Sequence, residues 1–144
     1  MLLLRLAGLQ DKEPILRLIE ELFNNSVYSK AAEFSPDDTW AHVERAIKGE
    51  PDVSAVILLL DDGVPIGILG CSAMVQMFNS SEKTGVELVF WITPGKRTQS
   101  GMKKLLKAYR YWCKKIKCTS ILMGKMKTND SVEIYSIRKL QPWP

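Results

Sequence analysis

Residues 86–116 read VELVFWITPGKRTQSGMKKLLKAYRYWCKKI. The first eight of them are mostly apolar and predict a strand, which Pro94-Gly95 ends. After a basic, hydroxyl-rich loop at residues 96–100, apolar side chains recur at three- and four-residue spacings and predict an amphipathic helix. The apolar stripe of this helix consists of Met102, Leu105, Leu106, Tyr109, Trp112, Cys113 and Ile116. This strand–loop–helix favours phosphate binding, because a helix N-terminus presents unpaired N–H groups and about half a positive charge.

The loop before this helix holds side chains that suit an anion. Lys96 and Arg97 would attract it, and residues 98–100 supply hydroxyl and amide donors. Gly101 would let the backbone come close to a ligand. The first turns of the helix contain no acidic residue that would repel an anion.

The rest of the chain predicts a mixed α/β fold with a largely antiparallel first half and a strand–helix–strand crossover in the second half. Asp61-Asp62-Gly63 is a strong hairpin signal. Gly67 and Gly70 indicate a bulge or bend in the return strand. The other predicted elements are strand 2–7, a helix between Asp11 and Asn24, helix 35–48, strand 53–60, strand 64–78, loop 79–85, strand 118–123 and helix 129–139.

Length and composition are those of an ordinary globular protein. The chain has 144 residues, of which 46% are apolar and 25% charged, so we expect a single domain over residues 1–144. No apolar run approaches the about 18 residues of a membrane span, and the first residues lack the pattern of a secretory signal. Three cysteines without metal-ligand spacing and one histidine argue against a metal site. We therefore expect a reduced, cytoplasmic, metal-free protein without membrane contact.

The net charge of +4 hides a division along the chain. Residues 1–87 hold seven basic and fourteen acidic side chains, a net of −7, and residues 88–144 hold thirteen basic and two acidic ones, a net of +11. This division indicates a polyanionic partner for the second half, either a nucleic acid or a phosphate-rich cofactor. The alternative is that the lysines only solvate a helix face, and composition does not separate the two.

The loop and the start of the helix resemble the acetyl-CoA signature of the GCN5-related N-acetyltransferases, the GNAT family. In that signature a strand and a proline precede Arg/Gln-x-x-Gly-x-Gly/Ala, which opens a helix with paired leucines. Arg97 takes the arginine position and Leu105-Leu106 the leucine pair, while the two glycine positions fall on Ser100 and Met102. The order of elements is similar over almost the whole chain. Short, divergent proteins of this kind are also found in tailed phages, an origin compatible with this sequence.

The resemblance implies a GNAT-like α/β sheet, flanked by helices, with a splayed central strand pair that binds acetyl-CoA. It implies that the backbone of Phe90, Trp91 and Ile92 pairs with the pantetheine arm. Asn129 and Tyr135 match the family's Asn…Tyr segment, and the family's last two strands are expected to be missing. The loop amides would hold the pyrophosphate. The resemblance therefore implies that the further cofactor-binding residues are Arg97, Thr98, Gln99, Ser100, Gly101 and Met102 of the loop and helix start, together with Asn129.

The resemblance also implies direct attack of an amine on the thioester, which needs a base for the ammonium and an acid for the departing thiolate. Tyr135 is the candidate acid; the alternative is a tyrosine that packs its ring on the sheet. Glu87 is the only acid on the predicted central strand and is the candidate base. The alternatives are a glutamate paired with a lysine, or a water chain in place of a base. His42 is expected at the surface, and Cys71 is expected to be structural.

The preferred function is therefore an acetyl-CoA-dependent N-acetyltransferase that acts on a primary amine of a small molecule or protein. The first alternative is a catalytically inactive GNAT-fold module that binds proteins, in a virion or in regulation. A nucleic-acid-binding module is less favoured. An unpaired strand edge near the C-terminus would also support a homodimer. A cationic acceptor is favoured by the acidic residues of the first half, Glu20, Glu21, Glu33, Asp37 and Asp38.

Overall fold

The computed structural model describes residues 1–124 and the backbone of residues 132–136. These residues form a six-stranded sheet in the order β1-β2-β3-β4-β5-β6, in which only the β4–β5 pair is parallel. The predicted mixed, largely antiparallel α/β fold is thus confirmed. The elements are β1 (Leu2–Leu6), α1 (Lys12–Asn24), α2 (Pro36–Lys48), β2 (Ser54–Asp61), β3 (Val64–Gln76), β4 (Asn79–Ile92), α3 (Gln99–Lys115), β5 (Ser120–Gly124) and β6 (Val132–Ser136), with short 3₁₀ helices at Leu9–Asp11 and Val27–Lys30.

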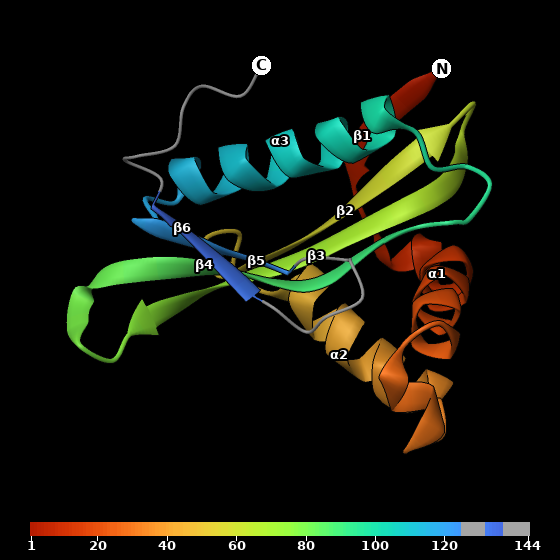
Figure 1. Cartoon of the computed structure of the whole chain (residues 1–144), viewed down its shortest axis with the longest axis horizontal. Helices are drawn as coiled ribbons and strands as arrows, with labels where there is room; N and C mark the ends of the chain where they lie inside the picture. The colour runs from red at the N-terminus through yellow and green to blue at the C-terminus, as the bar shows by residue number, and fades with distance from the viewer. Residues whose placement is uncertain (125–131, 137–144) are drawn as a thin grey trace.

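The molecule has three layers, with α3 on one face of the sheet and α1 and α2 on the other (Figure 1). On the α3 face, the fully buried Leu105 packs in a core that includes Phe90. On the opposite face, Ile15 and Leu18 of α1 pack in a second core with Trp91. Because side chains alternate along a strand, β4 contributes to both cores.

The helices follow the predicted periodicity, and the start of α2 is capped by a side chain. Ser35 Oγ accepts the Asp38 N–H at 3.2 Å at the start of α2, and Pro36 occupies the first turn. Asp11 precedes α1 as predicted, but its carboxylate makes no cap hydrogen bond to that helix. None of the helices in residues 1–124 is long and apolar enough to cross a membrane.

Turns and bulges fall where the glycines predicted them. Asp62 and Gly63 have φ of 49° and 83°, which is the backbone of a tight two-residue turn between β2 and β3. One bulge lies on β3 beside Gly67, where Ile66 has no partner on β2. The register also shifts at Gly70, where the unpaired residue is Leu88 on β4 rather than a residue of the return strand.

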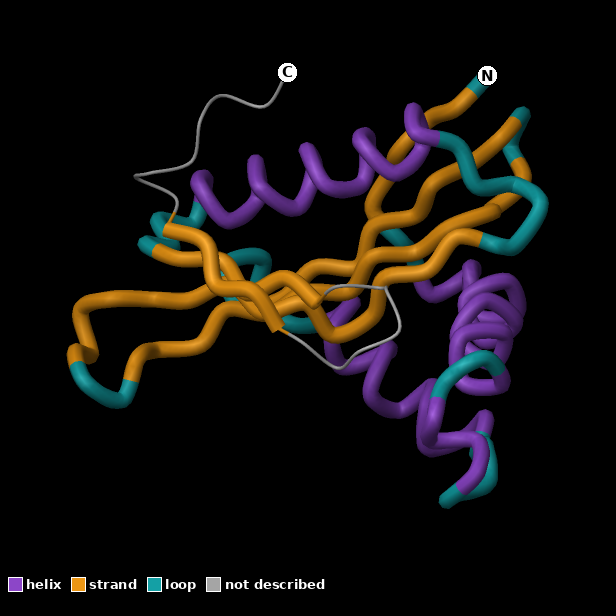
Figure 2. Tube along the Cα trace, viewed as in Figure 1, coloured by secondary structure: helices purple, strands orange, loops and turns teal. Residues whose placement is uncertain are grey.

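The predicted loop at residues 79–85 is wrong, because these residues begin β4. Together with β3 they form a long hairpin that extends beyond the other strands (Figure 2). Residues 79–84 are polar and show no apolar alternation, so their strand depends on pairing with β3 and on side-chain bonds. The Gln76 Nε2 donates to Thr84 Oγ1 at 2.9 Å, and the Thr84 and Ser120 hydroxyls lie 2.8 Å apart.

The predicted helix at residues 129–139 is also wrong, because residues 132–136 form β6, antiparallel to β5. In the run Val132-Glu133-Ile134-Tyr135, β-branched residues occupy alternate positions, which suits a strand better than a helix. The partner strand β5 supplies the backbone pairing that a single-sequence pattern does not reveal. The sheet therefore continues past β5 by one strand.

Candidate functional site

β4 and β5 separate in the middle of the sheet. Their parallel pairing joins residues 84–86 to residues 120–122. β4 then continues to Ile92, and its residues 87–92 have no β5 or β6 partner within the described part of the chain. Among the described residues, one edge of this half of β4 is therefore unpaired and forms a gap in the hydrogen bonding of the sheet. The splayed strand pair that the resemblance implies is thus confirmed.

A tight turn leads from this half of β4 to α3. The Lys96 N–H donates to the Thr93 carbonyl at 2.9 Å, and Gly95, with φ of 87°, takes the left-handed position of a type II turn. Thr98 then caps α3, since its Oγ accepts the Gly101 N–H at 3.0 Å. The N-terminus of α3, with the positive end of its dipole, therefore follows the free half of β4 directly.

Gly101 has a packing role that the sequence did not indicate. It is buried, and a Cβ at this position would lie 3.0 Å from Leu59 Cδ2 and 3.3 Å from Thr98 Oγ1. The glycine therefore lets α3 approach β2 closely. Residues 99–100 are exposed and Met102 is 39% exposed, so the outer side of the first helical turn is open to solvent.

Arg97 folds back onto the end of β4. Its guanidinium carbon lies 4.4 Å from the centroid of the Trp91 ring, and its Nε donates to the Ile92 carbonyl at 2.7 Å. Glu21 of α1 holds the same region, because it accepts from Trp91 Nε1 at 3.0 Å and from Thr93 Oγ1 at 2.8 Å. In the sequence, Glu21 is one of the acidic residues that favour a cationic acceptor. The sequence gave no signal for its contact with Trp91, 70 positions away.

The side chains of Phe90, Trp91 and Ile92 are buried, with exposed fractions of 7%, 4% and 2%. They belong to the two cores and are not available to a ligand. What these three residues can offer along the gap is therefore their backbone.

Glu87 lies where the gap begins, half-buried and opposite Cys71 in the β3–β4 register. Cys71 belongs to the α3-side core, so the bulge at Leu88 leaves Glu87 on that side of the sheet. Burial raises the pKa of the Tyr109 phenol, and nearby thiols and the charge of Glu87 raise it further to a smaller extent. Glu87 is therefore close enough to Tyr109 to affect its ionisation. Glu87 is not the only acid on the central strand, since β4 also includes Glu82.

Tyr135 lies on β6 and not on a helix. The strand register sets it opposite Ile121, which in turn pairs with Gly85 of β4. Tyr135 is therefore aligned across the sheet with Gly85, which precedes Glu87 by two residues on β4. Asn129 lies outside the described residues.

The remaining candidate nucleophiles and bases are poorly suited to chemistry. Burial raises the pKa of the Cys71 thiol to about 12 and also raises the pKa of the Cys113 and Cys118 thiols. These cysteines therefore stay protonated and unreactive near neutral pH. His42 is exposed on α2, as the sequence predicted.

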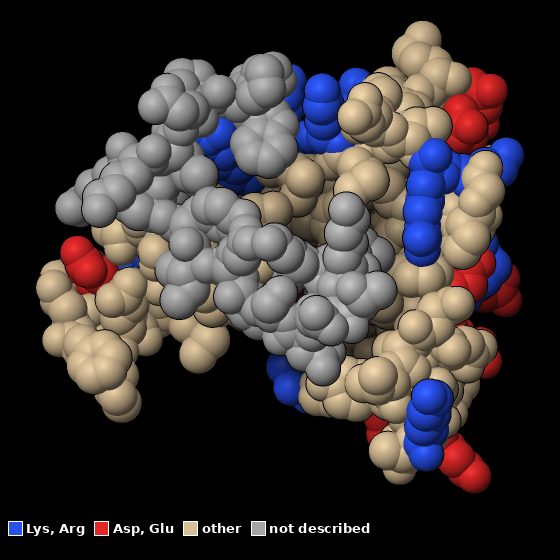
Figure 3. Space-filling model, in the orientation of Figure 1, with Lys and Arg blue, Asp and Glu red and all other residues tan. Residues whose placement is uncertain are grey.

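Positive charge surrounds the start of α3. Lys96, Arg97, Lys103 and Lys104 are exposed, and α3 contains no acidic residue. In Figure 3, blue Lys and Arg side chains are visible over α3. The gap beside β4, the helix N-terminus and this basic surface can together hold an extended molecule that carries amides at one end and phosphates at the other.

Comparisons with known proteins agree with this geometry. The model of the acetyltransferase (GNAT) family matches residues 16–136. Among solved structures, the chain resembles a GNAT family acetyltransferase of Staphylococcus aureus with a TM-score of 0.65 and 19% identity over 90% of this chain and 92% of that chain. It resembles glucosamine-6-phosphate N-acetyltransferase of Arabidopsis thaliana with a TM-score of 0.70 and 13% identity over 88% and 84%.

A third similar structure is aminoglycoside N-acetyltransferase AAC(6')-Iy in complex with the bisubstrate analogue CoA-S-monomethyl-acetylneamine, at a TM-score of 0.72 and 19% identity over 90% of this chain and 82% of that chain. No curated protein sequence matches the chain. At these identities the solved structures show the fold. The family model, however, covers most of the 144 residues, and the chain therefore belongs to the acetyltransferase (GNAT) family.

Proposed function

We propose that this protein transfers the acetyl group of acetyl-CoA to a primary amine. The observation that carries the proposal is the edge of β4 at residues 87–92, which has no strand partner among the described residues and leads through residues 93–98 to the N-terminus of α3. A peptide-like arm needs backbone partners along an open strand edge, and a pyrophosphate needs N–H donors at a helix start. The protein places both in one continuous path.

The residues present fit acetyl-CoA. Phe90, Trp91 and Ile92 would contribute backbone groups to the pantetheine arm, since their side chains are buried. The pyrophosphate would lie at the start of α3, against residues 97–102. Asn129 would also contact the cofactor, as the resemblance implies. When bound, acetyl-CoA supplies the activated acetyl group as a thioester.

We place two groups of this chain in the proton transfers. Glu87, at the start of the gap, accepts a proton from the acceptor ammonium, directly or through water. The freed amine then forms the N–C bond as the C–S bond breaks, and Tyr135 donates its phenolic proton to the departing sulfur. The proton that the new amide nitrogen releases returns to Tyr135, directly or through water. Two observations support these roles. Glu87 lies where β4 and β5 separate, and the strand register aligns Tyr135 with Gly85, two residues before Glu87.

A cationic small molecule is the acceptor class we favour. Two of the similar proteins are named as acetyltransferases of glucosamine-6-phosphate and of aminoglycosides. The surface of α1, α2 and the segment between them carries exposed acids, which would attract an ammonium group. These exposed acids include Glu20, Glu33, Asp37 and Asp38.

Calorimetric titration of the CoA-free protein with acetyl-CoA tests the proposal. We expect saturable one-to-one binding, weaker at high salt because charge contributes. Ser100→Glu should weaken binding at least about tenfold, since it puts a carboxylate where the pyrophosphate would lie. Tyr111→Glu adds the same charge to an exposed position farther along α3 and is the matched control.

Acetyl transfer is then measured as thiol release with glucosamine-6-phosphate, an aminoglycoside and a neutral primary amine. Cationic amines should react faster than the neutral one. Tyr135→Phe and Glu87→Gln should each slow turnover about 10²-fold or more without a matching loss of acetyl-CoA affinity. Full activity in both variants would contradict the assigned roles.

A non-catalytic binding module is the second candidate. One observation favours it: Arg97 Nε already uses the Ile92 carbonyl, a backbone group that the first proposal needs for the pantetheine arm. This candidate predicts a flat calorimetric trace at millimolar acetyl-CoA. Robust transfer to any amine would exclude it.

A further inference from the structure

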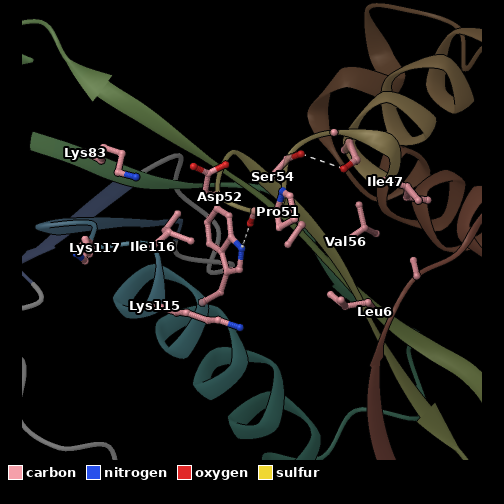
Figure 4. Close-up of a pocket in the computed structure, with 15 residues that line it drawn as sticks. Leu6, Ile47, Pro51, Asp52, Ser54, Val56, Lys83, Lys115, Ile116 and Lys117 are labelled. Carbon is pink, nitrogen blue, oxygen red and sulfur yellow. Dashed lines mark hydrogen bonds between the residues drawn. The ribbon is translucent and has the colours of Figure 1, made fainter.

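A cavity lies at the C-terminal end of α3, away from the loop that precedes this helix. It has a volume of about 600 Å³ and lies between the C-terminal parts of α2 and α3, the loop after α2, the end of β1 and the start of β2 (Figure 4). Cavities of this size hold small organic ligands. The 17 residues of α3 rise by about 25 Å, so this cavity is well separated from the N-terminus of α3.

The walls of this cavity are largely apolar and fixed by hydrogen bonds. Trp112 and Ile116 line it, each 9% exposed. Trp112 Nε1 donates to the Pro51 carbonyl at 3.0 Å and ties α3 to the loop after α2. Ser54 Oγ donates to the Ala46 carbonyl at 2.9 Å and ties β2 to α2. The elements that form the walls are therefore held together without a ligand.

Three lysines lie around the cavity, one from β4 and two from the end of α3 and the residues after it. Lys83 belongs to β4, Lys115 ends α3 and Lys117 follows it (Figure 4). Asp52 is the one acidic residue that residues 1–124 contribute to the lining. None of the three ammonium groups forms a salt bridge within residues 1–124. The cavity thus combines apolar walls with an excess of two positive charges.

Lys117 occupies a backbone position that favours glycine. Its φ is 66°, and α3 ends in a Schellman motif, with the Lys117 N–H bonded to the Lys114 carbonyl at 3.1 Å and the Cys118 N–H bonded to the Cys113 carbonyl at 2.9 Å. A side chain in this conformation is less favourable than glycine. Backbone geometry alone would therefore not select lysine at this position.

We propose that this cavity binds a small amphipathic carboxylate. Its apolar body would lie against Trp112 and Ile116, and its carboxylate would face Lys83, Lys115 and Lys117. The apolar walls exclude a strongly hydrated body such as a sugar. The three lysines, which form no salt bridge with the side chains of residues 1–124, favour an anion over a neutral or cationic ligand of the same shape. This site is distinct from the proposed acetyl-CoA site, because none of the residues that line the cavity is among those placed at that site.

Three probes with one apolar body test the charge preference. The full chain is titrated calorimetrically with 4-phenylbutyrate, 4-phenylbutan-1-ol and 4-phenylbutylamine, all without acetyl-CoA. The carboxylate should bind at least about tenfold more tightly than the alcohol, and the amine should bind most weakly. Equal affinity for the carboxylate and the alcohol, or no binding of the carboxylate at millimolar concentration, would overturn the proposal.

Two variants locate the site. Lys117→Gly should weaken 4-phenylbutyrate binding about threefold and should also raise the thermal midpoint of unfolding, because it relieves the backbone conformation. A loss of affinity in a more stable protein is not a folding defect. Lys107→Gln, on the exposed side of α3 outside the cavity, is the control and should leave affinity unchanged. An equal loss in the control, or displacement of the probe by acetyl-CoA, would contradict this location.

Discussion

The contact between Gly85 and Cys113 determines how closely α3 lies on β4. A Cβ at position 85 would lie 2.4 Å from Cys113 Sγ, far inside van der Waals distance, and Cys113 is fully buried. We expect Gly85→Ala to lower the free energy of unfolding by about 1–3 kcal/mol, as overpacking of a core does. Urea unfolding of the variant measures this loss.

The double variant Gly85→Ala/Cys113→Ala separates this overcrowding from a change in strand propensity. Removing the Sγ frees the space that the new methyl group needs. The cost of Gly85→Ala should therefore shrink by about 1 kcal/mol or more in the Cys113→Ala background. Additive losses would show that the contact does not limit packing.

Asp11 forms a charged cluster at the start of α1 in place of the helix cap predicted from the sequence. Its carboxylate accepts from Arg5 Nη1 and Nη2 at 2.7 and 2.9 Å and from the Gly8 N–H at 2.8 Å. The Arg5 guanidinium, with help from the Gly8 N–H, holds the pKa of Asp11 below its usual value. The folded protein therefore prefers the ionised carboxylate more strongly than the unfolded chain does.

The sign of this pKa shift sets a pH window. The stabilisation is complete above the ordinary aspartate pKa of about 4 and is lost as pH falls through the lower folded value. Asp11→Asn should cost about 1–3 kcal/mol at pH 7, and the difference from the original protein should close between about pH 5 and pH 2. Urea unfolding at several pH values measures it, with the exposed Glu33→Gln as control. A difference that does not vary with pH would argue against the ionised pair.

The candidate site was predictable from sequence only where local order determines it. Pro94, Gly95 and Thr98 act through turn and cap geometry within a few residues, so the loop and the start of α3 were predicted to within two residues. The predicted loop at residues 96–100 was too long, because α3 already begins at Gln99. The stacking of Arg97 on Trp91 and the contact of Glu21 with Trp91 depend on how α1 meets the sheet. No spacing in the sequence encodes such contacts.

At the scale of the helices, the two N-caps allow a matched comparison of stability and binding. Thr98 caps α3 and Ser35 caps α2, each through its hydroxyl oxygen. Thr98→Ala and Ser35→Ala should each cost about 1 kcal/mol of stability. Only Thr98→Ala should also weaken acetyl-CoA binding, because it disturbs the N-terminus proposed to hold the pyrophosphate. Calorimetry on both variants checks this; equal affinities would place the pyrophosphate elsewhere.

Elements with their own apolar periodicity were predicted from sequence, and elements that depend on a partner were not. α1, α2 and α3 each have an apolar face and lie within about two residues of their predicted bounds. The first part of β4 is polar on both faces and is a strand because β3 pairs with it. β6 is likewise defined by its pairing with β5, and the pattern of residues 129–139 taken alone favoured the wrong element.

At the scale of the whole molecule, one sheet separates two cores and links them. Phe90 and Ile92 pack under α3, while Trp91, between them on the same strand, packs under α1. Unfolding either face would displace β4 and so remove the support of the other. The charge division along the chain follows the same architecture, because the basic second half includes α3 and the acidic first half includes α1 and α2.

This coupling predicts that acetyl-CoA stabilises the whole protein and not only the α3 face. The proposed site uses β4 and α3, and β4 also supports the second core. At about 100 times its dissociation constant, a ligand that binds only the folded state adds about 2.7 kcal/mol to the free energy of unfolding. Thermal unfolding followed by near-ultraviolet circular dichroism should therefore show a single transition that moves to higher temperature as a unit. In Ser100→Glu the same acetyl-CoA concentration should produce little shift. Two transitions, of which the ligand moves only one, would mean that the two faces unfold independently and that residues 1–144 do not behave as a single domain.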